Sequence, residues 1–157
     1  MRIIAGDIGG TNTRLVFAVN NASTRRVLVE KHYPSTEFND FVEVLKLFLS
    51  EHDISLPVDA ACFAIAGPVE SAVVSVTNLS WVIRQQPLCE LLQTPDVAFI
   101  NDFAAVAYGI PGLDESDFLV LQKGLAAEKA IKPDAAVVGA GTGLGVAHLV
   151  RQKGHYK

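Results

Sequence analysis

This sequence of 157 residues has few cysteines, little positive charge and no long apolar run, which are the features of disulfide-rich, nucleic-acid-binding and membrane proteins. It contains two cysteines, Cys62 and Cys89, in apolar or helix-like surroundings and without Cys-x-x-Cys spacing. This pattern argues against a disulfide framework and against a cysteine zinc site. We therefore expect both thiols to be reduced packing residues of a cytoplasmic protein.

Positive charge is scarce as well. The sequence has 13 Lys and Arg against 17 Asp and Glu, a net charge of −4, and it has no basic run. It also lacks an apolar run long enough to cross a membrane, and Met1-Arg2 leads directly into a strand-like segment rather than a signal peptide. We therefore expect neither nucleic acid nor a membrane as a partner.

Apolar residues, in contrast, make up 50% of the chain. A chain of this length forms one domain or slightly more and buries about two-thirds of its unfolded surface. The apolar segments predict strands and helices by their spacing. Strands are expected at 2–8, 13–20, 26–32, 60–66, 70–76, 97–100, 118–121, 135–140 and 146–150, and helices at 38–52, 84–93 and 103–108, the first with a hydroxyl N-cap from Ser35 or Thr36.

The predicted order is three hairpin-linked strands followed by alternating helices and strands. Antiparallel ribbons followed by parallel crossovers form a mixed sheet with helices on its faces. The fold class is therefore α/β, with the β-β-β-α-β-α-β-α order of the ribonuclease-H-like fold. Because a strand, a glycine-rich turn and a strand recur near the end, we expect a small N-terminal domain at 1–133 and the first hairpin of a second domain at 134–157.

The first two predicted strands are joined by the turn Gly6-Asp7-Ile8-Gly9-Gly10-Thr11-Asn12, which is more polar than a plain connector. Gly9 and Gly10 lack Cβ atoms and can take positive φ, so their backbone N–H groups could approach an anion closely, as in phosphate-binding nests. Asp7 would repel that phosphate unless a cation lay between them, which makes Asp7 a candidate Mg²⁺ ligand, directly or through water. The alternative is a tight turn in which Asp7 bonds local amides.

A second glycine-rich turn, Gly139-Ala140-Gly141-Thr142-Gly143-Leu144-Gly145, also lies between strand-like segments. Gly141, Thr142 and Gly143 would offer amides and a hydroxyl to nucleotide phosphates. Phosphoryl transfer depends mainly on positioning and charge stabilisation, which backbone amides and a bound cation can supply. Plain turn chemistry is the alternative.

Asn101-Asp102 stands where a predicted strand meets a predicted helix. In open α/β sheets the carboxyl ends of the strands line the ligand crevice. Asp102 is therefore a candidate general base for a hydroxyl nucleophile, Asn101 could hydrogen-bond a polyol, and Thr77 and Asn78 could add polar contacts. The alternatives are a helix cap at Asn101-Asp102 and an ordinary turn at Thr77-Asn78.

Five motifs resemble those of the bacterial glucokinase family, in that family's order and spacing over almost the whole chain. They are Gly6-Asp7-Ile8-Gly9-Gly10-Thr11-Asn12, Ala66-Gly67-Pro68-Val69, Thr77-Asn78-Leu79-Ser80-Trp81, Ile100-Asn101-Asp102-Phe103 and Gly139-Ala140-Gly141-Thr142-Gly143-Leu144-Gly145. The family has the actin, sugar kinase and Hsp70-like ATPase fold. The resemblance implies transfer of the ATP γ-phosphate to the 6-hydroxyl of D-glucose in the cytoplasm, the first step of glycolysis.

The resemblance also implies roles for individual residues. Residues Gly6 to Thr11 would contact ATP phosphate, with Asp7 helping to place Mg²⁺. Gly141-Thr142-Gly143 would form the second phosphate loop. Asp102 would be the base for the sugar hydroxyl, and Asn101 would bind the sugar.

Glucokinases continue beyond the part that this sequence resembles, through a Glu-Gly-Gly-His sugar-binding segment, a further sugar-binding Glu and the adenosine pocket. We therefore expect an N-terminal fragment that does not phosphorylate glucose at a useful rate by itself. The hairpin predicted at 135–150 would be disordered, dock on the first domain, or pair with another chain, as in a homodimer.

Two other functions are compatible with the same scaffold. One is a kinase for another hexose, such as fructose or an N-acetylated hexosamine. The other is a non-catalytic, sugar-sensing regulator. The presence of Asp102 favours a kinase, since a sensor needs no base.

Overall fold

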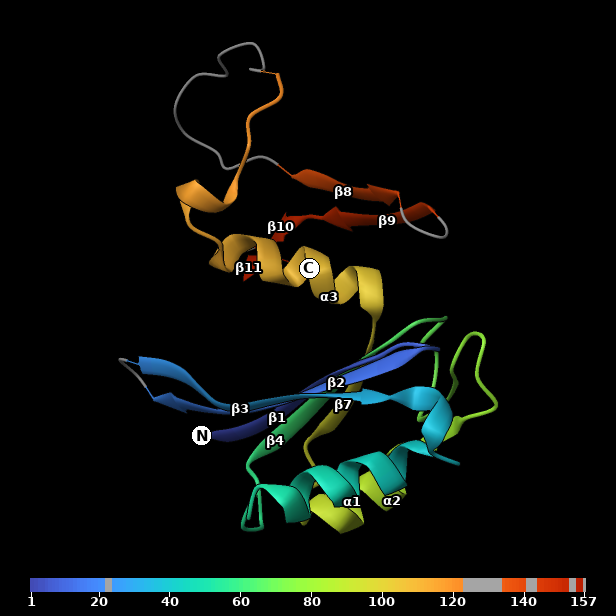
Figure 1. The fold of residues 1–157 in the computed structure, drawn as a ribbon. Helices are drawn as coiled ribbons and strands as arrows, with labels where there is room; N and C mark the ends of the chain where they lie inside the picture. The colour runs from blue at the N-terminus through green and yellow to red at the C-terminus, as the bar shows by residue number, and fades with distance from the viewer. Residues whose placement is uncertain (22–23, 123–133, 141–143, 153–154, 157) are drawn as a thin grey trace. The chain divides into compact units, whose positions relative to one another are not determined.

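The computed structural model describes residues 1–21, 24–122, 134–140, 144–152 and 155–156. The chain forms two compact units, unit 1 (Met1–Asp102) and unit 2 (Phe103–Lys157) (Figure 1). The boundary between the units thus precedes the domain boundary predicted at residues 133 and 134. That predicted assignment of domains stays a prediction.

Unit 1 is built on a five-stranded sheet in the order β3-β2-β1-β4-β7 (Figure 1). The first three strands pair antiparallel, whereas β1, β4 and β7 are parallel. This confirms the predicted mixed α/β sheet, and it aligns Ile8, Ile65 and Asn101 at one edge, where three parallel strands end. The strands are β1 (Arg2–Ile8), β2 (Asn12–Asn21), β3 (Thr24–Pro34), β4 (Ala60–Ile65) and β7 (Val97–Asn101).

The first helix, α1 (Phe41–Glu51), begins later than the predicted residue 38. Asp40 caps it, because its carboxylate accepts a hydrogen bond from the backbone N–H of Glu43 at 2.9 Å. Such a cap stabilises a helix by about 1 kcal/mol. The hydroxyl cap expected before this helix is wrong, since Ser35–Glu37 instead forms a short 3-10 helix, η1.

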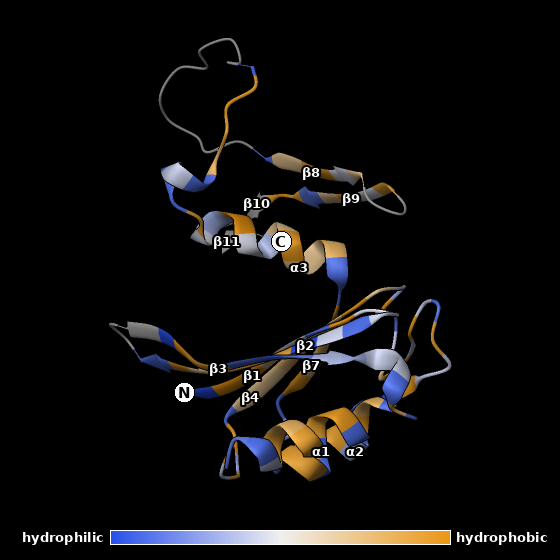
Figure 2. Cartoon of the chain, viewed as in Figure 1, coloured by the Kyte–Doolittle hydropathy of each residue, from blue (hydrophilic) through white to orange (hydrophobic). Residues whose placement is uncertain are grey.

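The hydrophobic core of unit 1 lies between the sheet and the two helices α1 and α2 (Gln85–Leu92), which cover one face of it. Figure 2 shows apolar residues along both helices and along β1 and β4. Phe41 of α1 meets Phe63 of β4 edge to face, with ring centroids 4.9 Å apart. Each buried side chain of this size contributes about 1.5–3 kcal/mol, so the strands that carry the candidate site rest on a well-packed layer.

A small two-stranded sheet, β5 (Val73–Ser75) with β6 (Val82–Arg84), lies in the connection between β4 and α2. The sequence predicted a strand at 70–76 but not β6. The indole of Trp81 is buried, and its Nε1 donates a hydrogen bond to the carbonyl oxygen of Phe38 at 3.2 Å. This side chain therefore holds the small sheet against the segment that precedes α1.

Unit 2 combines most of α3 (Asp102–Gly109) with an antiparallel hairpin of β8 (Ala135–Ala140) and β9 (Leu144–Leu149). Gly139 and Gly145 are cross-strand partners, and a Cβ atom at either would collide with the ring of Phe103. The two glycines therefore let the hairpin pack on α3. The unit also contains η2 (Ile110–Gly112), η3 (Glu115–Asp117), β10 (Arg151–Gln152) and β11 (His155–Tyr156).

The strand predicted at 118–121 is wrong. These residues follow η3 and join no sheet, and the side chain of Leu121 is 90% exposed. An apolar run forms a strand when another strand pairs with it, and the structure places none beside this run in the described part of the chain.

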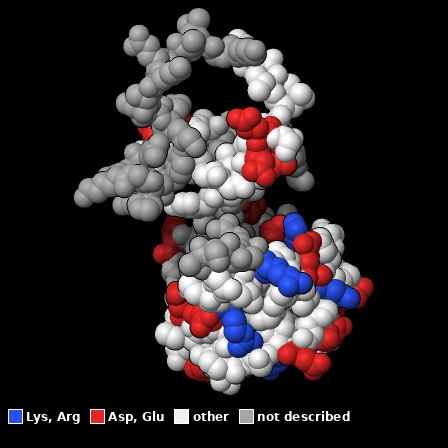
Figure 3. Space-filling model, turned by 90° about the vertical axis from the view of Figure 1, so that its left-hand side faces the viewer, with Lys and Arg blue, Asp and Glu red and all other residues white. Residues whose placement is uncertain are grey.

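The surface of unit 1 carries charges of both signs. Figure 3 shows Lys and Arg side chains interspersed with Asp and Glu side chains on the face in view. Among the residues that the structure describes, no helix combines the length and the apolar character that a membrane crossing requires.

Candidate functional site

The turn between β1 and β2 is held in place by a residue of η1. The Ser35 hydroxyl donates a hydrogen bond to the carbonyl oxygen of Gly9 at 2.9 Å, and the Ser35 N–H donates to the carbonyl oxygen of Thr11 at 2.9 Å. The hydroxyl of Thr13 lies 2.9 Å from that of Ser35, and both residues are fully buried. Because the Ser35 hydroxyl donates to Gly9, its oxygen accepts from Thr13. These bonds fix the carbonyls of Gly9 and Thr11, and the N–H of Gly9 closes the turn by donating to the carbonyl oxygen of Asn12 at 3.0 Å.

The glycines of this turn are required by close packing rather than by backbone angle. Neither Gly9 nor Gly10 has a positive φ, so that part of the expectation is wrong. A Cβ atom on Gly10 would lie 3.0 Å from the carbonyl oxygen of Thr77 and 3.3 Å from the Cβ of Asn78. The sequence-predicted residues Gly10, Thr77 and Asn78 are therefore in direct contact, and Asn78 adopts a left-handed conformation with φ of 63°.

Asp7 lies near the end of β1, on the sheet face opposite the helices. Its side chain is exposed, whereas the next residue, Ile8, is fully buried. Partial burial of the carboxyl group raises the pKa of Asp7, the negative charge of Asp102 raises it further, and the positive charge of Arg14 lowers it. Asp7 and Asp102 thus act on each other electrostatically at the edge where β1, β4 and β7 end.

The carboxylates of Asp7 and Asp102 suit a cation that is also bound by a substrate. Within the described ranges, no group of three or more His, Cys, Asp or Glu side chains is placed to hold a metal ion. Mg²⁺ is commonly held by one or two carboxylates together with substrate phosphates and water. Asp7 and the nearby Asp102 fit that pattern. The described side chains do not form a site in which the protein alone surrounds the metal.

Asn101 and Asp102 occupy the junction of β7 and α3. The side-chain nitrogen Nδ2 of Asn101 donates to the carbonyl oxygen of Gly67 at 3.0 Å and to Oδ1 of Asp102 at 2.9 Å. Asp102 is the first residue of α3. The predicted placement of these two side chains at the carboxyl end of a parallel strand is thus found, while their chemical roles stay predictions.

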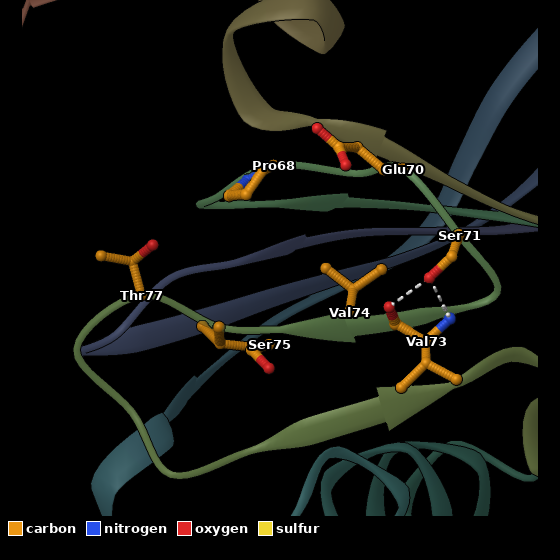
Figure 4. A pocket seen from close by; sticks show the side chains of 8 residues that line it. Pro68, Glu70, Ser71, Val73, Val74, Ser75 and Thr77 are labelled. Carbon is orange, nitrogen blue, oxygen red and sulfur yellow. Dashed lines mark hydrogen bonds between the residues drawn. The ribbon is translucent and has the colours of Figure 1, made fainter.

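A cavity of about 400 Å³ lies between the segment that follows β4 and strand β5 (Figure 4). Thr77 is among the residues that line it, and the lining includes none of the carboxylates predicted to act in the site. Figure 4 shows a local contact in its lining, in which the Ser71 hydroxyl is hydrogen-bonded to the backbone N–H and carbonyl oxygen of Val73. The full lining is Pro68, Glu70, Ser71, Val73, Val74, Ser75, Val76 and Thr77.

The structure thus brings together most of the predicted site residues in unit 1. Gly141, Thr142 and Gly143 lie outside the described residues, so the second phosphate loop stays a prediction. Sequence reasoning missed Ser35 and Gly67, whose bonds to the turn and to Asn101 place the other groups. Gly67 did stand in a quoted motif, but nothing in the sequence paired it with Asn101.

Comparison with known proteins gives a consistent result. The family model described as Glucokinase matches residues 4–157. A protein named glucokinase from Nostoc sp. is 42% identical over 158 residues, which is 99% of this chain and 45% of that protein. This chain therefore spans less than half of the length of that relative.

Solved structures show the same likeness. A glucokinase from an Antarctic psychrotroph has a TM-score of 0.83 at 32% identity, covering 99% of this chain and 48% of that one. A glucokinase from Balamuthia mandrillaris, solved in complex with glucose, has a TM-score of 0.71 at 27% identity, covering 99% of this chain and 46% of that one. On the match of the family model to nearly every residue, this chain belongs to the glucokinase family.

Proposed function

We propose that this chain supplies one half of the active site of a cytoplasmic glucokinase, which transfers the γ-phosphate of ATP to the 6-hydroxyl of D-glucose at the start of glycolysis. The observation that carries the proposal is the meeting of the β1–β2 turn, the Thr77-Asn78 turn and the Asn101-Asp102 junction in unit 1. Family membership supports the same reaction, as does the glucose in the Balamuthia mandrillaris structure.

In this mechanism Asp102 accepts the proton of the sugar 6-hydroxyl while that oxygen forms a bond to the γ-phosphorus of ATP and the bond to the ADP oxygen breaks. A positioned base of this kind typically accelerates a reaction about 10²–10⁴-fold. Asn101, Thr77 and Asn78 would contact the sugar. These residues all lie at or near the edge where the parallel strands end.

In this turn, Gly10 and Thr11 would present backbone amides to the ATP phosphates, because Ser35 fixes the carbonyls of Gly9 and Thr11 and the N–H of Gly9 is bonded to the carbonyl oxygen of Asn12. Asp7 would hold Mg²⁺, which supplies a positive charge against the phosphate oxygens. Gly141, Thr142 and Gly143 would complete the phosphate site.

The test is the substitution Asp102→Asn in a polypeptide of full family length. We expect kcat for glucose phosphorylation to fall at least about 10²-fold, the contribution typical of a general base. The affinity for glucose, measured by calorimetry without ATP, should change little because the shape of the side chain is kept. Turnover close to that of the unsubstituted protein would show that Asp102 is not the base.

A further inference from the structure

The side-chain amide of Asn101 donates hydrogen bonds both to the backbone and to the carboxylate of Asp102. Its nitrogen has two hydrogens, and two acceptors lie within bonding distance: the Gly67 carbonyl oxygen at 3.0 Å and Asp102 Oδ1 at 2.9 Å. A hydrogen bond from an amide to an ionised carboxylate is roughly twice as strong as one between neutral groups. The nitrogen of Asn101 thus joins the carboxylate of Asp102 to a backbone carbonyl of another segment.

The carbonyl of Gly67 is itself held in a defined position. Gly67 has a φ of 148°, a conformation that other residues rarely adopt. A Cβ atom there would lie 3.2 Å from both the Ser75 carbonyl oxygen and the Thr77 hydroxyl. The Thr77 N–H also donates to the carbonyl oxygen of the neighbouring Ala66 at 2.9 Å. Contacts with Ser75 and Thr77 therefore hold the segment around Gly67 in place independently of its bond to Asn101.

We propose that Asn101 is a positioning residue that orients the Asp102 carboxylate, with the Gly67 carbonyl as its fixed support. This inference rests on the proposed function, because it assigns Asp102 the role of base. An aspartate carboxyl group rotates over a broad range about its last torsion. The bond from Asn101 restricts that rotation, so the carboxylate faces the sugar hydroxyl before the substrate arrives. A contact of Asn101 with the sugar would then use its oxygen rather than its nitrogen.

The first experiment separates the nitrogen of Asn101 from its oxygen. The variant Asn101→Asp keeps the shape and one oxygen but replaces the donor to Asp102 with a second negative charge. In the full-length kinase we expect kcat to fall at least about 10-fold, because one hydrogen bond to a charged group is lost and the two carboxylates repel each other, with the glucose Kd changed less than about threefold. A kcat within about threefold of the unsubstituted value, or a loss confined to glucose affinity, would overturn the proposal.

A double-mutant cycle supplies a readout that a purely structural role would not produce. If Asn101 acts through the carboxylate, Asn101→Ala should lower kcat strongly in the unsubstituted protein but less than about threefold in the Asp102→Asn background. An equal loss in both backgrounds would overturn the proposal.

Gly67→Ala is the second variant, for use where substitution of Asn101 prevents folding. It keeps the side chains of Asn101 and Asp102 but shifts the Gly67 carbonyl, so it should lower kcat in the unsubstituted protein and change kcat less than about threefold in the Asp102→Asn background. The glucose Kd should rise as well, because the added Cβ would lie 3.2 Å from the hydroxyl of Thr77, which is proposed to contact the sugar. An unchanged kcat in a folded Gly67→Ala protein would also overturn the proposal. If the unsubstituted full-length protein shows no ATP-dependent phosphorylation of glucose, the proposed function fails and this inference with it. If that protein is active and the cycle is additive, the inference fails alone.

Discussion

Asp7 and Arg14 are direct partners across the antiparallel pair of β1 and β2. The positive charge of Arg14 lowers the pKa of Asp7, but partial burial and the charge of Asp102 outweigh it, so the pKa of Asp7 is raised overall. Arg14 is also engaged by Glu30, whose carboxylate lies 2.8 Å from its guanidinium. The surroundings of Asp7 therefore favour the protonated form of its carboxyl group more than water does.

This electrostatic balance predicts a pH-dependent gain in stability from Asp7→Asn. A carboxyl group with a raised pKa in the folded state favours folding at acidic pH, and this contribution is lost as pH rises through that pKa. At pH 7 the substitution removes an unfavourable charge, so the Tm should rise by about 1–2 °C, a small effect because the group is exposed. The gain should vanish below about pH 4, near the pKa of an unfolded aspartate.

Thermal unfolding of the 157-residue chain at several pH values measures this effect. In the Arg14→Ala background the gain at pH 7 should be larger, since the cation that offsets the charge of Asp7 is absent. A lower Tm for Asp7→Asn at pH 7 would contradict the prediction.

Ser35→Ala should loosen the β1–β2 turn. The substitution leaves the carbonyl oxygen of Gly9 and the hydroxyl of Thr13 without a buried partner, which costs about 1–3 kcal/mol. Urea unfolding measures the loss, and in the full-length kinase the KM for ATP should rise as well. Thr36→Ala is the matched control, because Thr36 is adjacent and exposed and should change stability by less than about 0.5 kcal/mol.

Gly10→Ala should disturb the contact between the two turns of the candidate site. Its Cβ atom would lie 3.0 Å from the Thr77 carbonyl oxygen, so one turn must move, at a cost of about 1–3 kcal/mol. For Gly112→Ala, no atom lies within 4 Å of the added Cβ, and stability should be unchanged or slightly raised. Equal stabilities of the two variants in urea would show that the close packing at Gly10 is not needed.

The 157-residue chain by itself should not phosphorylate glucose at a useful rate. It covers 45% of the Nostoc glucokinase, and many enzymes complete their catalytic site by closing one loop or domain over another. A coupled assay with ATP and glucose measures this, with a full-length glucokinase as the positive control. Robust turnover by the purified chain would contradict the prediction.

The sequence was most informative where apolar runs are bounded by turn residues. The predicted strands at 2–8, 60–66 and 97–100 agree with β1, β4 and β7, because a buried parallel strand needs a continuous apolar run. It was least informative for short elements such as β6, which has three residues and is defined by its pairing with β5. The start of α1 was misplaced because Ser35 and Asp40 are both good capping residues and the sequence does not choose between them.

By itself, the sequence determined which residues stand at the strand ends and in the turn after β1: Asp7, Gly10 and the Asn101-Asp102 pair. Local patterns are sufficient for that, because a strand and the turn after it are adjacent in the chain. The tertiary structure alone decided which groups hold these residues in place. Ser35 reaches Gly9 across 26 positions and Asn101 reaches Gly67 across 34. Hydrogen bonds between segments so far apart depend on sheet order and register, so the local sequence carries no signal for them.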